Sequence, residues 1–194
     1  MSLHRNIMRR FRMEDSVSLP YIGVKGGREE LVRMFGDLKY TRGVEVGTWR
    51  GHFAAQMCAD IPNLKLTCVD PWNAPEGRSE RHYLEAVGRL TDLGVEIMRM
   101  TSMEAVGKFE DKSLDYVYID ADHTFDYVMM DIIMWSKKVR SGGIVSGHDY
   151  LFSPDIARAV QTYVDCHGVH PWYVLREFYN RDRVGTGSFF WVVP

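Results

Sequence analysis

The chain has 194 residues, of which 45% are hydrophobic and 26% charged, a composition typical of a globular domain and unlike that of a disordered chain. Its 24 basic and 26 acidic residues give a net charge of −2, which disfavours nucleic acid and anionic membranes as partners. No apolar run reaches the length of a membrane span, and the first residues lack the apolar core of a secretory signal, so we expect a cytoplasmic protein.

The three cysteines, Cys58, Cys68 and Cys166, are widely spaced along the chain. Their spacing matches neither a disulfide framework nor the paired ligands of a zinc site. Because each lies in an apolar helical or extended pattern, we expect three buried thiols.

The first 25 residues form an N-terminal arm with a basic, amphipathic pattern. Its arginines alternate with apolar side chains and stand at Arg5, Arg9, Arg10 and Arg12. Such an arm can contact phosphate or fold over a substrate, but a solvated terminal segment is the commoner form of this pattern. We therefore expect a solvated arm preceding the core of a single domain that spans residues 1–194.

After the arm, helical and extended patterns alternate along the chain. Apolar residues at helical spacing or in short runs predict, in order, a helix at 28–38, a strand at 43–46, a helix at 50–61, a strand at 64–69, a helix at 80–93 and a strand at 95–100. Residues 73–78 are expected to form a loop.

The second half continues in the same way. It predicts helices at 101–109, at 125–139 and from Pro154 onward, and strands at 114–119, 144–146, 172–178 and 188–193, the last two joined by a polar hairpin loop at 179–187. The helix at 125–139 is apolar on nearly every side, so we expect it to be well buried. The alternation predicts an α/β fold with one Rossmann-like, doubly wound sheet of about seven strands, mostly parallel, with an antiparallel C-terminal strand.

A glycine-bearing loop, Glu45-x-Gly47-x-x-x-Gly51, joins the first of these strands to its helix. The two glycines permit close backbone approach, and the helix offers free N–H groups at its first turn, so Gly47, Thr48 and Gly51 are candidates for nucleotide binding. A dinucleotide fold wants Gly-x-Gly-x-x-Gly to hold a pyrophosphate, and Glu45 would repel phosphate. The loop therefore favours a cationic nucleoside such as S-adenosylmethionine (SAM), which carries no phosphate.

Further polar residues follow the next two strands. Asp70 can accept hydrogen bonds from both ribose hydroxyls of a nucleoside, although an aspartate before proline is also a common turn residue. Ser102 can lie beside the adenine ring or cap its own helix. Aromatic side chains near this edge can line a pocket for a ring-shaped substrate or pack as core: Trp49, Trp72, Phe125, Tyr150 and Phe152.

A second polar group follows the last two predicted parallel strands. It comprises Asp120-Ala-Asp-His123 and His148-Asp149. Ligands bind outside the carboxyl ends of parallel strands, so these side chains are candidates for catalysis. Each also has an ordinary explanation, because an aspartate can cap the following helix and a histidine can be a hydrogen-bonded loop residue.

From Gly43 to Tyr150 the sequence resembles the class I SAM-dependent methyltransferases. Glu45-Val-Gly47 is similar to that family's first motif, Asp70 to its ribose-binding acid and Val117–His123 to its fourth motif. The Asp120-x-x-His123 pattern and the later Gly147-His-Asp-Tyr150 resemble the O-methyltransferases of the macrocin and catechol type. In those relatives an acid after the fourth strand and a pair after the fifth bind Mg²⁺, and the histidine can act as base.

The resemblance implies methyl transfer from SAM to a hydroxyl of a small molecule, a sugar or an aromatic metabolite. It implies Glu45, Gly47, Thr48, Gly51, Asp70, Trp72, Ser102 and Asp120 as cofactor-binding residues, with His123 as base and Asp120 and Asp149 beside it. A divalent metal would be held by Asp120, His148 and Asp149. His148 stands where the macrocin-type pattern has a carboxylate, so this set suits Mn²⁺, Fe²⁺ or Zn²⁺ better than Mg²⁺.

Two alternatives remain from the sequence. An NAD-type oxidoreductase would share the glycine loop and Asp70, although the glycine spacing and Glu45 oppose it. A methyltransferase-like domain without catalytic activity could serve as a cofactor-binding or partner module. The sequence does not fix the oligomeric state, and a homodimer is compatible with it.

Overall fold

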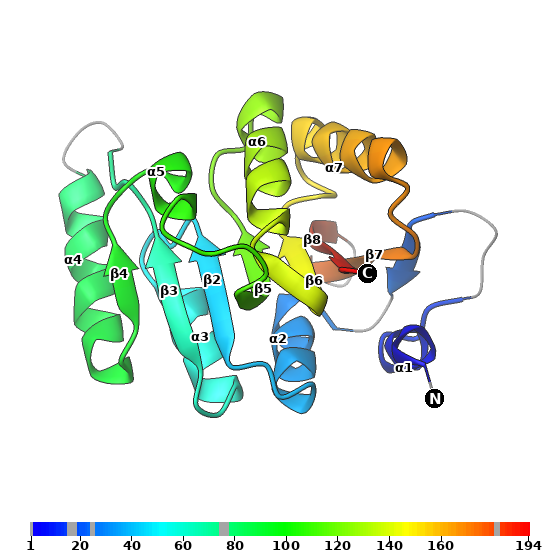
Figure 1. Cartoon of the computed structure of the whole chain (residues 1–194), viewed down its shortest axis with the longest axis horizontal. Helices are drawn as coiled ribbons and strands as arrows, with labels where there is room; N and C mark the ends of the chain where they lie inside the picture. Colours follow the sequence, from blue (N-terminus) through cyan, green and yellow to red (C-terminus); the bar gives the residue numbers. More distant parts are fainter. Residues whose placement is uncertain (1, 15–18, 24–25, 74–77, 181–182) are drawn as a thin grey trace.

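The computed structural model describes residues 2–14, 19–23, 26–73, 78–180 and 183–194. Their strands form one sheet in the order β1-β7-β8-β6-β5-β2-β3-β4 (Figure 1). All neighbouring pairs are parallel except β6 with β8 and β7 with β8. The predicted α/β class and the mostly parallel sheet with antiparallel C-terminal pairing are confirmed, with eight strands in place of about seven.

The first half of the chain supplies β2, β3 and β4 at one end of the sheet and β1 at the opposite edge. Its elements are α1 (Leu3–Arg10), β1 (Tyr21–Gly23), α2 (Arg28–Asp37), β2 (Arg42–Val46), α3 (His52–Asp60), β3 (Lys65–Val69), α4 (Arg78–Leu90), the 3-10 turn η1 (Thr91–Leu93) and β4 (Glu96–Met98). From α2 to β4 the order of helices and strands follows the sequence prediction. Of the predicted loop at 73–78, residues 74–77 lie outside the described residues.

The second half adds the strands β5 and β6 and the C-terminal pair β7 and β8. Its elements are α5 (Ser102–Val106), β5 (Leu114–Ile119), α6 (Phe125–Ser136), β6 (Val139–Gly147), α7 (Pro154–His167), β7 (Trp172–Asn180) and β8 (Arg183–Val192). The last two strands are longer than predicted, so most of the predicted hairpin loop at 179–187 is strand, and residues 181–182 lie outside the described residues.

Two apolar cores, one on each face of the sheet, hold the helices in place. Successive residues of β5 separate between them, because side chains of a strand alternate between its faces. Tyr116 and Tyr118 pack with α1, α2, α3 and α4, whereas Val117 and Ile119 pack with α5, α6 and α7. The parallel strands are therefore buried on both faces, which explains their nearly continuous apolar sequences.

The N-terminal arm is not a solvated segment, contrary to the sequence expectation. The helix α1 inserts Ile7 and Phe11 into the first core, where both are fully buried. His4 Nδ1 lies 2.7 Å from the Tyr173 hydroxyl oxygen on β7, and Arg10 forms an ion pair with Glu30. Burial of the apolar face of α1 outweighs the cost of ordering a terminus, and β1 extends the sheet by pairing with β7.

Two smaller expectations are also wrong. The helix α6 is not buried all round, because Tyr127, Met130 and Ile133 on one side are exposed. Cys166 is exposed and Cys58 is half-buried, so only Cys68 is a fully buried thiol.

Within the residues that the structure describes, no helix is long and apolar enough to span a membrane.

Candidate active site

A cavity of about 770 Å³ opens at the carboxyl ends of the central parallel strands. Its walls include residues that follow β2, β3, β4, β5 and β6 in turn. Most of the residues singled out in the sequence line it, namely Glu45, Gly47, Thr48, Asp70, Ser102, Asp120, His123, His148 and Asp149. Gly51 and Trp72 do not, so their predicted contact with a cofactor is not supported by the cavity.

The glycine loop lies against the end of β5 because Gly47 has no side chain. Gly47 has φ +93°, a region that favours glycine, and a Cβ there would overlap the main-chain carbonyl of Asp120. The main-chain N–H of Asp120 in turn donates to the carbonyl of Val46 at 2.7 Å. The glycine loop and the Asp120 loop are therefore packed directly against each other. Gly51 instead is the N-cap of α3, with φ +72°, and a Cβ there would lie 2.9 Å from the Leu90 side chain.

Glu45 is an acid buried at the base of the cavity, with only 2% of its surface exposed. Burial, together with the negative charge of Asp120, raises the pKa of Glu45 to about 8. The Cys68 thiol donates to its carboxyl oxygen at 3.6 Å. In the free protein Glu45 therefore holds its proton at neutral pH, whereas the sequence suggested a carboxylate.

Asp70 is fixed by the backbone of two tryptophans. Its carboxylate accepts the N–H of Trp49 at 2.8 Å and the N–H of Trp72 at 2.7 Å, one on each oxygen. Trp72 is buried, and its indole N–H donates to the Trp49 carbonyl at 2.7 Å. Trp72 thus shapes the turn that presents Asp70, and each Asp70 oxygen keeps a lone pair for a further donor.

The sequence suggested that Ser102 caps its own helix, but it does not. Thr101 is the N-cap of α5 and forms a capping box with Glu104. The Ser102 hydroxyl instead donates to Asp131 of α6 and accepts the indole N–H of Trp135 at 2.8 Å. Asp131, which no sequence pattern marked, is buried and lines the cavity.

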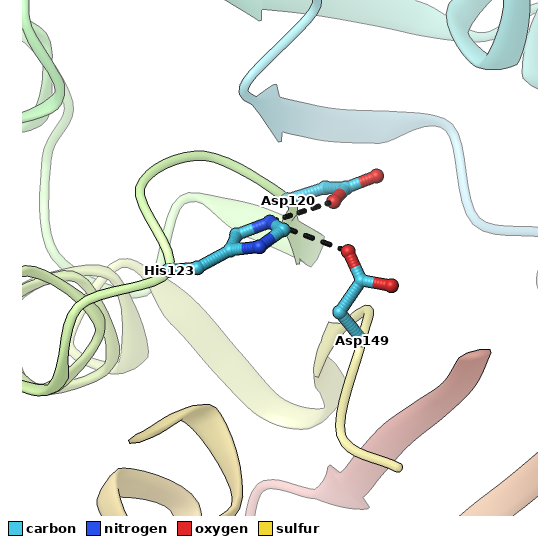
Figure 2. Close-up of side chains that lie close together, drawn as sticks. All are labelled: Asp120, His123 and Asp149. Atoms are coloured by element: carbon cyan, nitrogen blue, oxygen red, sulfur yellow. Dashed lines mark ion pairs between the residues drawn. The ribbon is translucent and has the colours of Figure 1, made fainter. Parts of the chain in front are cut away.

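His123 lies between two carboxylates that come from different loops (Figure 2). Its Nε2 is 3.2 Å from Asp149 Oδ2 and 4.0 Å from Asp120 Oδ1. Asp149 adopts φ +57°, a strained conformation for a residue with a side chain and one that often marks functional sites. The neighbouring Asp122 accepts the N–H and hydroxyl of Thr124 at the start of α6, so this acid is the one engaged at the helix terminus.

His148 is held on the other side of the same carboxylates. Its Nδ1 lies 3.3 Å from Asp149 Oδ1, and its Nε2 lies 3.0 Å from Glu177 and 3.1 Å from the Thr186 hydroxyl. Burial alone would lower the pKa of His148, but the hydrogen bonds to Asp149 and Glu177 and the charge of Asp120 raise it to about 9. His148 therefore faces the site as a buried cation.

The pKa values of Asp120 and Asp149, the two acids beside His148, shift in opposite directions. Burial raises the pKa of Asp149, but the hydrogen bond and positive charge of His148 outweigh it, so the pKa is lowered. The pKa of Asp120 is raised, because burial and the charge of Asp149 outweigh the nearby histidines. Asp149 is therefore the carboxylate that stays ionised beside His123.

The side chains whose possible metal-ligating atoms come together differ from the predicted metal ligands Asp120, His148 and Asp149. The side chains whose donor atoms all lie within 4.8 Å of one another are Asp120, His123 and Asp149. His148, the third predicted ligand, has both ring nitrogens directed at carboxylates, because Glu177 approaches it from β7. No local pattern marked Glu177, since only the pairing of β7 with β8 brings it to this edge.

The aromatic residues suggested for a substrate ring are only partly at the cavity. Trp49 lines it, and so does Tyr127, which was not among the aromatic residues suggested from the sequence. Both are exposed, at 57% and 59%. Tyr150 packs against Trp172 with ring centroids 5.6 Å apart, and Phe152 is exposed without lining the cavity.

Comparison with solved structures shows the same fold in several methyltransferases. The O-methyltransferase TomG from Streptomyces achromogenes, solved with SAM, is 16% identical with a TM-score of 0.65, covering 96% of this chain and 86% of its own. An O-methyltransferase from Bacillus cereus, solved with S-adenosylhomocysteine (SAH), is 14% identical with a TM-score of 0.66. The match covers 90% of this chain and 84% of that one. An rRNA methylase from Streptococcus thermophilus is 13% identical with a TM-score of 0.63, covering 86% and 95%.

At these identities the solved structures establish the fold and leave the acceptor open, so the absence of a nucleic-acid partner stays a prediction. No curated protein matches the chain. A family model described as a methyltransferase domain matches residues 44–150, which is more than half of the sequence. This match favours methyl transfer over the NAD-type oxidoreductase considered from the sequence. The chain therefore belongs to the methyltransferase domain family.

Proposed function

We propose that this protein transfers a methyl group from SAM to a hydroxyl of a small molecule, with His123 as the general base. The observation that carries the proposal is the position of His123 between Asp120 and Asp149, on the wall of the cavity that also contains Glu45 and Asp70. SAM would supply a methyl group on a positively charged sulfur. An in-line displacement of this kind depends chiefly on positioning of the two reactants.

The residues on the cofactor side fit SAM. The cavity of about 770 Å³ lies within the range of small-molecule sites. Gly47 leaves the backbone bare where a Cβ would collide with the Asp120 loop, and Asp70 can accept two ribose hydroxyls on its remaining lone pairs. Glu45 is an acid on the cavity wall, which suits the amino or sulfonium cation of SAM.

On the acceptor side, His123 has the contacts that a general base needs. Its side chain is 41% exposed, so an acceptor can reach it, and Asp149 lies at hydrogen-bond distance from its Nε2. When the imidazole takes the hydroxyl proton, the ionised Asp149 stabilises the resulting positive charge. Trp49 and Tyr127 at the cavity wall favour an acceptor with a flat or ring-shaped body, an aromatic metabolite or a sugar.

Binding of SAM is the first test. At pH 7 we expect SAM to bind and to release a proton, because a bound cation favours the ionised form of Glu45, whose pKa of about 8 keeps it protonated in the free protein. NADH should not bind, since this loop lacks the Gly-x-Gly-x-x-Gly spacing that holds a pyrophosphate. Titration calorimetry in two buffers of different ionisation enthalpy measures both the affinity and the protons released.

The matched control is Glu45→Gln, which has nearly the same shape and cannot ionise. It should bind SAM without releasing a proton. Binding of NADH in preference to SAM would contradict the proposed function. Tight SAM binding with no SAH produced from any member of a broad panel of hydroxyl acceptors would favour a catalytically inactive binding module.

A divalent cation is a second candidate for the acceptor side, and the convergence of three donors favours it. Asp120, His123 and Asp149 would hold the ion, and the mixture of carboxylates with an imidazole suits Mn²⁺, Fe²⁺ or Zn²⁺. A bound cation would lower the pKa of the acceptor hydroxyl. As a base, His123 donates its Nε2–H to Asp149 and accepts the hydroxyl proton at Nδ1. As a metal ligand through Nε2, the neutral imidazole carries its hydrogen on Nδ1 and cannot accept another, so the two roles exclude each other.

Exhaustive chelation separates these roles. With His123 as base, we expect turnover to change less than about twofold, because the His123–Asp149 pair needs no ion to take up a proton. The measurement is the rate of SAH formation before and after chelation, with Mn²⁺ added back. A loss of about tenfold or more that Mn²⁺ restores would contradict the base role and assign His123 to a metal site.

A further inference from the structure

Asp131 is a buried acid that the proposed reaction does not use. It lies in α6, is 4% exposed and yet lines the cavity. Its Oδ1 accepts the Ser102 hydroxyl, which in turn accepts the indole N–H of Trp135 at 2.8 Å. Within the described part of the chain, no donor reaches Oδ2, and no lysine or arginine forms an ion pair with Asp131.

The second carboxylate oxygen of Asp131 can accept a hydrogen bond from a ligand in the cavity, because no protein donor among the described residues occupies it. Removing a carboxylate from water without replacing its hydrogen bonds is costly, and here burial raises the pKa of Asp131 to about 6. The side chain could have been apolar if it only filled space between α5 and α6. Its position on the cavity wall indicates that a ligand supplies the missing donor.

The order of the strands identifies which part of SAM would reach it. The sheet runs β5-β2-β3-β4, with the catalytic residues after β5, the glycine loop after β2 and Asp70 after β3. In SAM the ribose lies between the sulfonium and the adenine. With the ribose at Asp70, the adenine extends toward β4, about one strand spacing of 4.8 Å further, where Ser102 begins α5 beside Asp131.

We propose that Asp131 Oδ2 accepts a hydrogen bond from the 6-amino group of adenine and thereby selects adenine among purines. This inference rests on the proposed function, because it takes SAM as the ligand. Hydrogen bonds to charged groups contribute more than neutral ones, so the amino group adds substantially to affinity. Ser102 is a positioning residue here, since its hydroxyl fixes the other carboxylate oxygen.

The test compares SAH with an analogue whose purine carries hydrogen in place of the 6-amino group. The wild-type protein should bind SAH about 10-fold or more tightly than the analogue. Asp131→Leu, which cannot accept a hydrogen bond, should reduce this preference to about twofold or less by weakening SAH binding alone. The matched control is Asp126→Leu, the same change at an exposed position of the same helix, which should keep the wild-type preference.

The outcomes separate this inference from the proposed function. Equal affinity of the wild-type protein for SAH and the analogue overturns the role of Asp131, and this result needs no variant to fold. If Asp131 only joins α5 to α6, Asp131→Leu will weaken both ligands equally and the preference will survive. If the wild-type protein binds no SAH, the proposed function fails and the adenine assignment fails with it.

Discussion

Replacement of His123 by alanine should lower methyl transfer at least about 100-fold and leave the affinity for SAH within about twofold of wild type. A general base contributes about this much to rate, and here no other imidazole replaces it, because both ring nitrogens of His148 face carboxylates. His123 belongs to the Asp120–Asp149 group, separate from the glycine loop and Asp70 that are assigned to the cofactor. The checks are the rate of SAH formation at saturating SAM and the dissociation constant of SAH.

The matched control for this variant is His170→Ala, which removes an exposed histidine far along the chain from the site. It should retain wild-type turnover and affinity. Full activity of His123→Ala would remove His123 from the mechanism, whether as base or as metal ligand. A large loss of SAH affinity in His123→Ala would instead place this side chain against the cofactor.

Replacement of Gly47 by alanine should destabilise the fold by about 2–4 kcal/mol and abolish measurable SAH binding. The positive φ of Gly47 alone costs an alanine about 1 kcal/mol, and the overlap of its Cβ with the Asp120 backbone costs about a further 1–3 kcal/mol. Relief of the overlap requires the glycine loop and the Asp120 loop to separate, which alters both halves of the site. Urea unfolding and SAH titration measure the two effects.

Gly94→Ala is the control that isolates the backbone term. Gly94 also has a positive φ, +69°, but a Cβ there meets no atom within 4 Å. This variant should lose about 1 kcal/mol and bind SAH normally. Equal destabilisation of the two variants would show that the contact between Gly47 and the Asp120 loop contributes nothing beyond φ.

The sequence predicted the central part of the fold well, because local patterns carry its information. Apolar runs such as 114–119 and helical spacing such as that of 28–38 agree with β5 and α2 to within one residue. Short-range patterns failed at α1 and β1, where long-range packing decides the outcome. Ile7 and Phe11 become core residues only when α1 meets the sheet face, and nothing within the arm itself distinguishes that contact from solvent.

By itself the sequence determined that polar residues follow successive strands, and parallel strands necessarily bring Glu45, Asp70, Asp120 and Asp149 to one edge.

Only the tertiary structure decided how those residues are paired. Glu177 arrives from β7 and engages His148, which leaves His123 as the imidazole of the converging group. Asp131 arrives from α6 and meets Ser102. Such contacts depend on the register of distant strands and on the packing of helices on the sheet, and neither is encoded in the local sequence pattern around any of these residues.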